Sequence, residues 1–506
     1  MGKMSIYLKK ADYVDIMIFA EGTYPYVRGG VSSWIHQLIT QLPTFTFGIC
    51  FIGSQPSDYD EIRYELPPNL MHIEVHYLFN PNKKEKANYQ ESDKTLEVVR
   101  SLHHAFSKQG TIPDEIKNLA FFQNELTESY FQHSRGAWEY INEMYMKNCP
   151  DMPFIDYFWT LKNMHSPLWL LASIAQNLPK CSILHSPSTG YAGFAGALSS
   201  YHTDTPFILT EHGIYTRERK IDLMSTTWIS YRKPMLLRQP EEFNYIKQIW
   251  INFFEKIGQF AYQRAERIFS LFPGAKEIQI NFGAEPSKLE VIPNGVDVDR
   301  LKTTLSKRPD KIPMVITLIG RVVPIKDIKT FIRAMRIVVN TIPDVEGWIV
   351  GPLDEDQNYA DECFKMVESL NLTDNVKFLG FQNIMEILPQ TGIQTLTSIS
   401  EGMPLVILEG FAAGVPCVAT DVGSCRNLIE GALDDEDIAI GHAGVVTEIA
   451  NPSQLAHAYI SLLTDKEEWQ QAHHAALKRV NQYYRQEMFL KKYENYYRKA
   501  VEQWQE

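Results

Sequence analysis

"SISEGMPLVILEGFAAGVPCVATDVGS", residues 398–424, carries the pattern on which the fold prediction depends. The residues "GIQTLTSIS" predict a buried strand, Glu401 and Gly402 follow in a loop, and Pro404 has the fixed φ that suits the first turn of a helix. "LVILEGFAAG" then predicts an apolar helix that ends at Gly414, and "PCVAT" predicts the next strand. This order of elements indicates part of a parallel α/β sheet.

Two glutamates lie inside this apolar segment, Glu401 at the carboxyl end of the strand and Glu409 more than one turn inside the helix. Burying a carboxylate without partners costs several kcal/mol. Glu409 must therefore meet a cation, a cluster of donors or a ligand rich in hydroxyl groups, such as a ribose diol. The alternative is an internal ion pair that only supports the fold.

The same alternation of apolar runs and helical patterns continues along the chain, for example in "VDIMIFA" (14–20) and "TPFILTEH" (205–212). It predicts the α/β class, with parallel sheets covered on both faces. A chain of 506 residues exceeds the size of one hydrophobic core, so two domains are expected.

We place a first Rossmann-like domain at residues 1–300, with a helical insertion at about 83–180, and a second at 301–483. A helix at 484–506 alternates apolar and charged residues and is expected to pack back onto the first domain. Parallel sheets bind ligands outside the carboxyl ends of their strands, so a cleft between two such domains is the expected site.

Composition excludes several classes of protein. The net charge is −12 without a basic block, which argues against nucleic acid as a partner. The six cysteines are far apart and form no CxxC pair, so neither a disulfide scaffold nor a zinc site is predicted. "VDIMIFA" is too short and too acidic for a signal-peptide core, and no apolar run approaches a membrane span. We expect a cytoplasmic location.

The first strand is followed by Arg28, Gly29 and Gly30 at the start of a helical pattern. Glycines at a helix N-terminus let backbone N–H groups approach an anion, and the helix dipole favours negative charge there. The alternative is a tight turn that needs positive φ. Neither GxGxxG nor GxxxxGK[ST] occurs, which argues against a nicotinamide enzyme or a P-loop kinase.

The strand "TPFILTEHG" ends in His212, which lies where a functional side chain would face a cleft, although a structural role is the alternative. We interpret Arg217 and Arg219 as members of surface or interdomain ion pairs. In the second domain, "VITLIGRVVPIKD" places Arg321 and Lys326 between a strand and a helix, where they suit a pyrophosphate. The alternative is a solvated basic loop.

The combination of "GG" after the first strand, "EHG", "GR…K" and the two glutamates of "SEGMPLVILEGFAAGVPCVAT" resembles the retaining glycosyltransferases of the GT-B fold, family 4, over nearly the whole chain. "EGTYPYVRGGVSSW" and "LTEHGIYTRER" resemble one branch of it, the PelF glycosyltransferases of bacterial Pel exopolysaccharide synthesis. The resemblance implies the GT-B architecture, in which two Rossmann-like domains face each other across a cleft.

The resemblance also implies roles for matching positions. Arg321 and Lys326 would hold the donor diphosphate, Glu409 the ribose hydroxyls and Glu401 the hydroxyls of the transferred sugar. His212 would lie near the donor sugar or the acceptor. The expected catalytic residues are therefore Arg321, Lys326, Glu401 and His212, and the expected donor-binding residues are Gly29, Gly30, Gly320, Gly402, Met403, Pro404, Leu405 and Glu409.

Two features bear on metals and on the diphosphate site. Many relatives have Gly directly after the lysine, where this chain has Asp327, and we expect its carboxylate to point away or to fix Lys326. No DxD pair suited to Mg²⁺ follows a strand, and "DED" (354–356) and "DDED" (434–437) are interpreted as solvent-exposed acidic loops. No metal and no cofactor are expected.

The resemblance implies a retaining transfer of a sugar from a UDP-sugar to a growing bacterial exopolysaccharide, with membrane-bound synthase partners that could recruit the chain to the inner membrane. Double displacement would need a carboxylate nucleophile on the far face of the sugar, and the sequence indicates no convincing residue for that role. Same-face attack is therefore favoured. The alternatives are a UDP-sugar hydrolase or epimerase of the same fold, and a non-catalytic nucleotide-sugar-binding component of a synthase.

Overall fold

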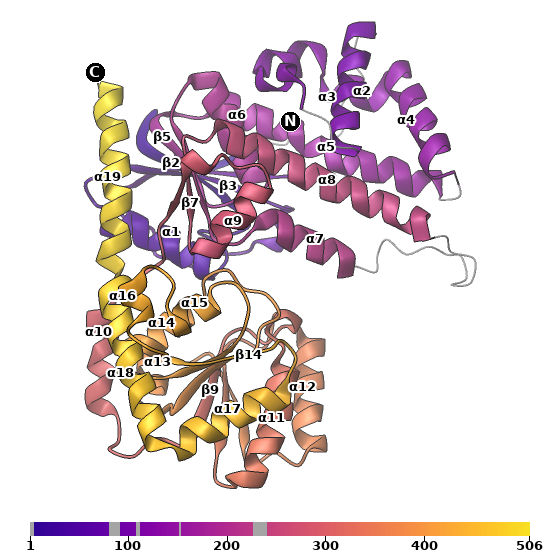
Figure 1. Ribbon diagram of the computed structural model, residues 1–506. Helices are drawn as coiled ribbons and strands as arrows, with labels where there is room; N and C mark the ends of the chain where they lie inside the picture. Colours follow the sequence, from indigo (N-terminus) through magenta and orange to yellow (C-terminus); the bar gives the residue numbers. More distant parts are fainter. Residues whose placement is uncertain (1–4, 80–91, 108–111, 151–152, 226–239, 506) are drawn as a thin grey trace. The chain divides into compact units, whose positions relative to one another are not determined.

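The computed structural model describes residues 5–79, 92–107, 112–150, 153–225 and 240–505. They form two compact units, each built around its own sheet (Figure 1). Unit 1 comprises Met1–Ser270, Lys276–Glu290 and Glu494–Glu506. Unit 2 comprises Leu271–Ala275 and Val291–Tyr493.

Unit 1 contains an eight-stranded sheet in the order β1-β4-β3-β2-β5-β6-β7-β8. β1 is antiparallel to β4, whereas the pairs from β4 across to β7 are parallel. Ile16 to Ala20 of β2 are all fully buried, as expected for a strand covered on both faces. The strands are β1 (Ser5–Lys9), β2 (Tyr13–Glu21), β3 (Phe47–Gly53), β4 (Leu70–Tyr77), β5 (Lys180–Ser186), β6 (Phe207–Glu211), β7 (Arg267–Ser270) and β8 (Leu289–Val291).

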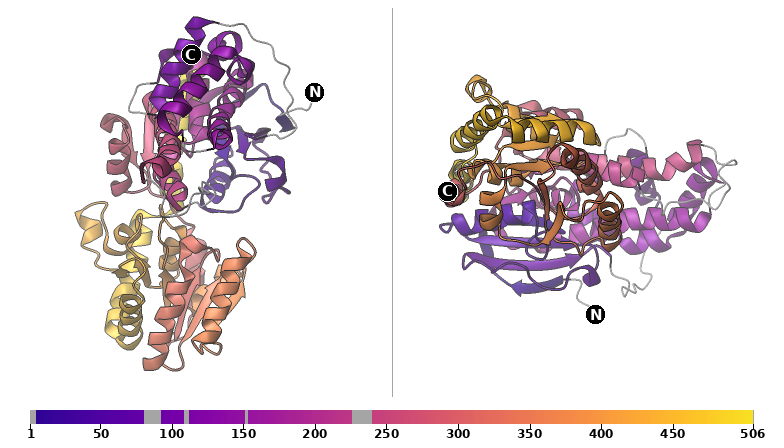
Figure 2. Two further views of the ribbon diagram at one scale, coloured as in Figure 1. Left: turned by 90° about the vertical axis from the view of Figure 1, so that its right-hand side faces the viewer. Right: turned by 90° about the horizontal axis from the view of Figure 1, so that it is seen from below.

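The predicted helical insertion corresponds to the segment between β4 and β5. It contains α2 (Asp93–Ser107), η2 (Asp114–Lys117), η3 (Phe121–Glu125), α3 (Glu128–His133), α4 (Arg135–Asn148) and α5 (Phe154–Asn177). Both views of Figure 2 show its helices gathered at one side of the unit 1 sheet. Their apolar side chains belong to the same hydrophobic core as those of β2 and β3, so the insertion enlarges this core and is not a separate domain.

The remaining helices of the first part of the chain connect the strands. They are α1 (Gly30–Gln41), η1 (Pro56–Asp58), α6 (Tyr191–Thr203), α7 (Tyr215–Ser225), α8 (Pro240–Arg264), α9 (Pro273–Asn281) and η5 (Pro286–Lys288). α8 packs against α2, α6 and α7. The insertion therefore supports α8 from one side, and α8 in turn contributes to the cavity of unit 1.

Unit 2 contains a six-stranded parallel sheet in the order β11-β10-β9-β12-β13-β14. Its strands are β9 (Val315–Ile319), β10 (Glu346–Val350), β11 (Val376–Gly380), β12 (Ile393–Leu396), β13 (Cys417–Thr420) and β14 (Gly444–Thr447). Its helices are α10 (Val298–Lys302), η6 (Thr303–Lys307), η7 (Pro324–Lys326), α11 (Ile328–Thr341), α12 (Gln357–Ser369), α13 (Ile384–Ile387), η8 (Leu388–Gln390), α14 (Leu405–Ala412), α15 (Cys425–Glu430), α16 (Asp435–Ile438), α17 (Pro452–Thr464) and α18 (Lys466–Tyr483).

The expected boundary between residues 300 and 301 falls inside α10. Val298 and Leu301 of this helix are buried in the same core as Phe411 of α14, so α10 belongs to unit 2, which already begins at Val291. The predicted boundary therefore lies about ten residues beyond the start of this part of unit 2.

The last helix, α19 (Gln486–Gln505), begins two residues later than expected, and its residues from Glu494 onward belong to unit 1. Tyr497 lies fully buried, with its hydroxyl 2.7 Å from Nδ1 of His185 on β5. The ring of Trp504 lies 4.6 Å from that of Tyr13 on β2. These contacts fix the end of the chain to the unit 1 sheet.

Among the described strands, β1, β4 and β14 were not predicted. β4, "LMHIEVHY", buries the polar side chains of His72, Glu74 and His76, which are 1%, 1% and 3% exposed. Polar residues in the interior break the apolar pattern by which a buried strand is recognised. β14 is short, with four residues, and follows an irregular segment.

Candidate functional site

Lys326 lies in a loop that is fastened to the end of a neighbouring strand. The loop follows β9, and Thr397 beyond β12 donates a hydrogen bond from Oγ1 to the carbonyl oxygen of Lys326 at 2.8 Å. The Ile399 N–H donates to the carbonyl oxygen of Ile325 at 2.9 Å. β9 and β12 are parallel neighbours, so these contacts hold Lys326 at the carboxyl edge of the unit 2 sheet.

The ammonium group of Lys326 meets the carboxylate of Glu401 at this edge. Nζ lies 2.5 Å from Oε1 of Glu401, and Ser398 donates to the same oxygen at 2.6 Å. The side chains of Lys326 and Glu401 are 20% and 14% exposed. A positive charge is therefore held in place, mostly shielded but still accessible to a ligand.

Two glycines let the strand-end loops approach each other closely. Gly423 has a φ of 53°, and a Cβ there would lie 2.3 Å from the carbonyl oxygens of both Glu401 and Gly402. Gly351 has a φ of 154°, and a Cβ there would lie 1.9 Å from the carbonyl oxygen of Gly320. No other residue fits either position, because the left-handed region disfavours a side chain and the space is already filled.

Gly402 to Leu405 form the entry to α14, as predicted. Pro404 is the N-cap, and the first-turn N–H groups of a helix have no partner within the helix. The sulfur of Met403 accepts a hydrogen bond from the N–H of Asn294 at 3.3 Å, so the Met403 side chain is buried in the core and only its backbone can meet a ligand. Exposed N–H groups and the helix dipole favour an anion here.

Glu409 lies one turn further into α14 and is partly exposed. Among the described residues, none donates a hydrogen bond to its carboxylate or lies within ion-pair distance of it. Burial raises the pKa of Glu409, and the charge of Arg300 on α10 partly offsets this. The internal ion pair considered from the sequence is therefore not formed among the described residues.

Arg321 and Asp327 lie on either side of Lys326 in the sequence, and their side chains have other partners. Arg321 forms an exposed ion pair with Glu355 at 2.8 Å, and exposed pairs of this kind contribute about 0–1 kcal/mol, so a ligand can displace it. Asp327 has a φ of 44°, in the region that favours glycine, and its carboxylate accepts from the N–H of Thr330 at 3.3 Å. The Asp327 carboxylate therefore caps the N-terminus of α11.

One interpretation of the acidic segments is wrong. Asp437, the last residue of "DDED", is completely buried and its Oδ1 lies 2.7 Å from Nε of Arg479 on α18. Arg479 also donates to the carbonyl oxygens of Ile429 and Gly441, at 2.7 and 2.8 Å. An arginine far along the chain supplies the partner that permits this burial, and local sequence does not reveal it.

Gly29 and Gly30 lie in unit 1, before and at the start of α1. Gly29 has an extended φ of 171°, and neither residue is in the left-handed region, so the tight-turn interpretation is wrong. A Cβ at either position would meet nothing within 4 Å. The described chain itself does not require glycine at these positions, and the surroundings of this helix N-terminus are open.

His212 lines a cavity of about 650 Å³ in unit 1, at the carboxyl ends of β2, β3 and β6. Burial lowers the pKa of His212 to about 3, so the imidazole is neutral at physiological pH. Its Nε2 is buried without a hydrogen-bond partner among the described residues, and its ring lies 4.5 Å from that of Trp34. A neutral imidazole can exchange a hydrogen bond with a ligand but does not supply a positive charge.

Other residues of this cavity were not singled out from the sequence. Glu21 accepts from the hydroxyl of Tyr215 at 2.8 Å and from the N–H of Ala192 at 3.0 Å, and burial raises its pKa against the opposing charge of Arg219. Arg219 is exposed, lies 5.2 Å above the ring of Tyr215 and lines the cavity. Arg217 is exposed.

Glu211, beside His212, has a structural role. Its carboxylate accepts hydrogen bonds from Thr189, Tyr262 and Gln279 at 2.8, 2.6 and 2.8 Å. It therefore fastens the end of β6 to its surroundings and leaves His212 to face the cavity.

The structure divides the predicted site between the two units. Unit 2 brings together Gly320, Lys326, Glu401, the "GMPL" segment and Glu409, whereas Gly29, Gly30 and His212 belong to unit 1. Among the described residues, the side chains at the unit 2 site form no cluster of three metal ligands. What they offer is a cation, a helix N-terminus and a carboxylate to which no described residue donates a hydrogen bond.

Comparison with known proteins assigns this arrangement to a class. Residues 302–479 match the model described as Glycosyl transferases group 1, and residues 14–287 match the model described as Domain of unknown function (DUF3492). The fold is that of GT-B glycosyltransferases, and the group 1 match lies within unit 2. The DUF3492 model spans more than half of the chain, and the chain belongs to that family.

Two curated relatives match parts of the chain. A UDP-Gal:alpha-D-GlcNAc-diphosphoundecaprenol alpha-1,3-galactosyltransferase of Escherichia coli is 29% identical over 41% of this chain and 54% of its own length. An N-acetyl-alpha-D-glucosaminyl L-malate synthase of Bacillus anthracis is 32% identical over 26% of this chain and 33% of its own length. The chain thus spans about half or less of these two relatives.

Solved structures share the fold over nearly the whole chain. HepE of Anabaena, in complex with UDP and glucose, has a TM-score of 0.59 and 15% identity, covering 95% of this chain and 98% of its own. A sucrose-phosphate synthase of Thermosynechococcus elongatus has a TM-score of 0.57 and 15% identity, covering 96% and 98%.

The helices were also compared with the requirements of a membrane span. Within the described residues, none is both long enough and apolar enough to cross a bilayer.

Proposed function

We propose that this chain is a retaining glycosyltransferase that moves a sugar from a UDP-sugar onto a growing bacterial exopolysaccharide of the Pel type. The observation that carries the proposal is the unit 2 site. Lys326 and Glu401 pair at the carboxyl edge of a parallel sheet, the "GMPL" segment after Glu401 leads into α14, and Glu409 lies one turn into that helix. A nucleoside diphosphate presents two charged phosphates and a ribose diol, which are complementary to these groups.

The names of similar proteins support a UDP-sugar as the donor. The Escherichia coli relative is named for UDP-Gal, and the structure of HepE holds UDP and glucose. In our assignment Lys326 and the α14 N-terminus bind the diphosphate, and Arg321 joins them by leaving Glu355. Glu409 accepts hydrogen bonds from the ribose hydroxyls.

Glu401 connects donor binding to sugar recognition. Its Oε1 holds Lys326 and Ser398. When the diphosphate shares the ammonium group of Lys326, Glu401 can turn an oxygen toward the hydroxyls of the transferred sugar. This exchange keeps the site close to neutral before the donor arrives.

The proposed mechanism needs stabilisation of the leaving group. As the bond to the sugar breaks, negative charge grows on the diphosphate, and Lys326 and the N–H groups of α14 are fixed beside that position. Losing one such preorganised contact typically costs about 10² to 10³ in kcat. We propose same-face attack, with the leaving phosphate accepting the proton of the acceptor hydroxyl and no metal required.

We assign the acceptor to unit 1, in the cavity that His212 lines. Aromatic side chains contribute to its wall, among them Tyr59, Tyr191 and Trp250. Flat rings of this kind suit the apolar faces of sugars, and Glu21 and Arg219 add polar contacts. His212, as a neutral imidazole, would hydrogen-bond a sugar hydroxyl.

The test is turnover of labelled UDP-sugars with and without a polysaccharide acceptor. We expect label in polymer, with NMR showing that the anomeric configuration is retained. Lys326→Ala should lower kcat by about 10² to 10³-fold. The matched control is Lys329→Ala, which removes a lysine on α11 that pairs with Glu362.

Other outcomes would contradict the proposal in distinct ways. Free sugar or an epimer as the main product would indicate a hydrolase or an epimerase. UDP-sugar binding without any turnover would indicate a non-catalytic component. A Lys326→Ala enzyme within about threefold of the Lys329→Ala control would refute the role of Lys326.

Membrane attachment is a further part of the proposal. We propose that membrane-bound synthase partners bring the chain to the inner membrane, as the PelF resemblance implies. Co-sedimentation with membranes that carry or lack such partners would test it.

A further inference from the structure

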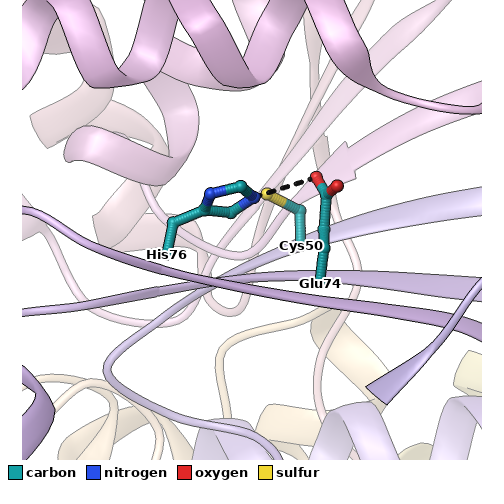
Figure 3. A group of neighbouring side chains, drawn as sticks. All are labelled: Cys50, Glu74 and His76. Carbon is teal, nitrogen blue, oxygen red and sulfur yellow. Dashed lines mark ion pairs between the residues drawn. The ribbon is translucent and has the colours of Figure 1, made fainter. Parts of the chain in front are cut away.

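A cluster of metal-ligand side chains lies inside the unit 1 sheet. Glu74 and His76 are two residues apart on β4, so their side chains lie on the same face of the strand. Cys50 on β3 is the direct strand partner of Glu74. Figure 3 shows the three side chains on the same side of the paired strands, pointing toward one another. Cys50, Glu74 and His76 are 0%, 1% and 3% exposed.

The distances within the cluster allow the three side chains to share one ion. One ligand atom from each of Cys50, Glu74 and His76 lies within 4.8 Å of the others. Nε2 of His76 is 3.3 Å from Oε1 of Glu74, which is longer than the ~2.9 Å typical of an N–H···O hydrogen bond. Ligands about 2.0–2.1 Å from a tetrahedral zinc ion lie roughly 3.3 Å apart.

The carboxylate is also short of donors. Oε1 of Glu74 accepts no hydrogen bond from any described residue, although it is buried. A buried carboxylate oxygen without a donor lowers stability unless a cation or a donor reaches it.

His72 lies two residues before Glu74, and its side chain is on the same side of β4. Its Nε2 is 3.5 Å from Oε2 of Glu74, and its Nδ1 accepts from the N–H of Ala11 at 3.2 Å. This contact orients the second carboxylate oxygen and leaves the first to face Cys50 and His76. Groups that orient a metal ligand in this way commonly change metal affinity by about 10- to 100-fold.

We propose that Cys50, Glu74 and His76 bind one Zn²⁺ ion, with His72 as a positioning residue and water completing the coordination. Sulfur, imidazole nitrogen and carboxylate oxygen are the ligands that zinc prefers. Zinc displaces the thiol proton of Cys50, which is released to solvent, and no electron is transferred. The ion would lock β4 to β3 near the edge of the unit 1 sheet.

This site is separate from the proposed transfer reaction and does not depend on it. Its ligands belong to β3 and β4, whereas the proposed donor site is built from unit 2. Zinc here would stabilise unit 1, so its loss should lower Tm.

The experiment measures metal in the full chain, purified without a polyhistidine tag and equilibrated with Zn²⁺. We expect about one zinc per chain by plasma mass spectrometry, and at least a tenfold loss in Cys50→Ser and Glu74→Gln. Cys181→Ser is the matched control, because Cys181 is also buried in this sheet, on β5, outside the cluster. His72→Gln should weaken affinity by about 10- to 100-fold in competition with a chromophoric chelator.

A second measurement uses only the wild-type chain, so it tests the proposal even if the variants do not fold. The wild-type chain, stripped of zinc and loaded with Co²⁺, should show a near-ultraviolet sulfur-to-cobalt charge-transfer band and a Tm several degrees above the stripped chain. Two results would overturn the proposal: a wild-type chain that takes up no stoichiometric zinc, or zinc content in folded Cys50→Ser and Glu74→Gln equal to that of Cys181→Ser.

Discussion

Replacing Glu409 by glutamine should weaken UDP binding without destabilising the protein. The carboxylate is partly exposed in α14, and no described residue donates a hydrogen bond to it. Glutamine keeps the shape and one acceptor oxygen but removes the charge. A residue with a structural ion pair would show the opposite behaviour, a loss of stability with ligand binding affected only indirectly.

The size of the effect follows from the contacts that are lost. Hydrogen bonds to a charged group contribute roughly 1.5–3 kcal/mol, so Glu409→Gln should raise the Kd for UDP by about 10- to 150-fold. The same substitution should not lower the stability of the folded chain. Because burial raises the pKa of Glu409 in the folded chain, the ionised form lowers stability above that pKa, and this cost disappears as the pH falls. At neutral pH the Tm of Glu409→Gln should be unchanged or higher.

Calorimetric titration with UDP and with its 2′,3′-dideoxy analogue separates the contacts. The wild-type chain should lose affinity for the analogue, and Glu409→Gln should lose little more, because the same hydrogen bonds are already missing. Glu430→Gln, which alters an exposed pair with Arg426, is the control. Equal Kd values for UDP in Glu409→Gln and this control, or a Tm several degrees below wild type, would refute the reasoning.

Two further predictions concern stability. Arg479→Met leaves Asp437 buried without its partner and should cost about 3–5 kcal/mol in urea unfolding, whereas the exposed Arg426→Met should cost about 0–1 kcal/mol; similar losses would contradict this. Burial lowers the pKa of His185 to about 3, against about 6.5 when unfolded, so its contribution is present above pH 6.5 and decreases by about 2 kcal/mol at pH 5. His185→Gln should flatten this pH dependence of the unfolding free energy, and an unchanged slope would argue against a neutral buried imidazole.

The alternation of apolar runs with helical patterns predicted the fold class, because a parallel sheet covered on both faces requires strands that are apolar throughout. β2 and β3 match this requirement. β4 does not, because its interior positions hold His72, Glu74 and His76, whose polar groups face one another on the same side of the strand. Pattern recognition therefore fails where polar side chains satisfy one another in the interior.

In the candidate donor site, too, the sequence predicted the positions of the charged residues but not their partners. Spacing placed Glu401 at a strand end and Glu409 inside a helix, because a strand, a loop and a helix are local structures with fixed periods. The pairing of Lys326 with Glu401, and of Arg321 with Glu355, depends on which strands become neighbours in the sheet. Sequence spacing carries no information on such contacts.

The sequence by itself determined the periodic elements, the two-domain organisation and the identity of the charged groups at the strand ends. Only the tertiary structure decided which charges are partnered: Asp437 by Arg479, Lys326 by Glu401, and Glu409 by no described residue. It also brought Cys50 beside Glu74 and His76, although cysteine spacing predicted no metal site. The physical reason is that periodicity is a property of a few consecutive residues, whereas the partner of a buried charge comes from wherever the fold places one.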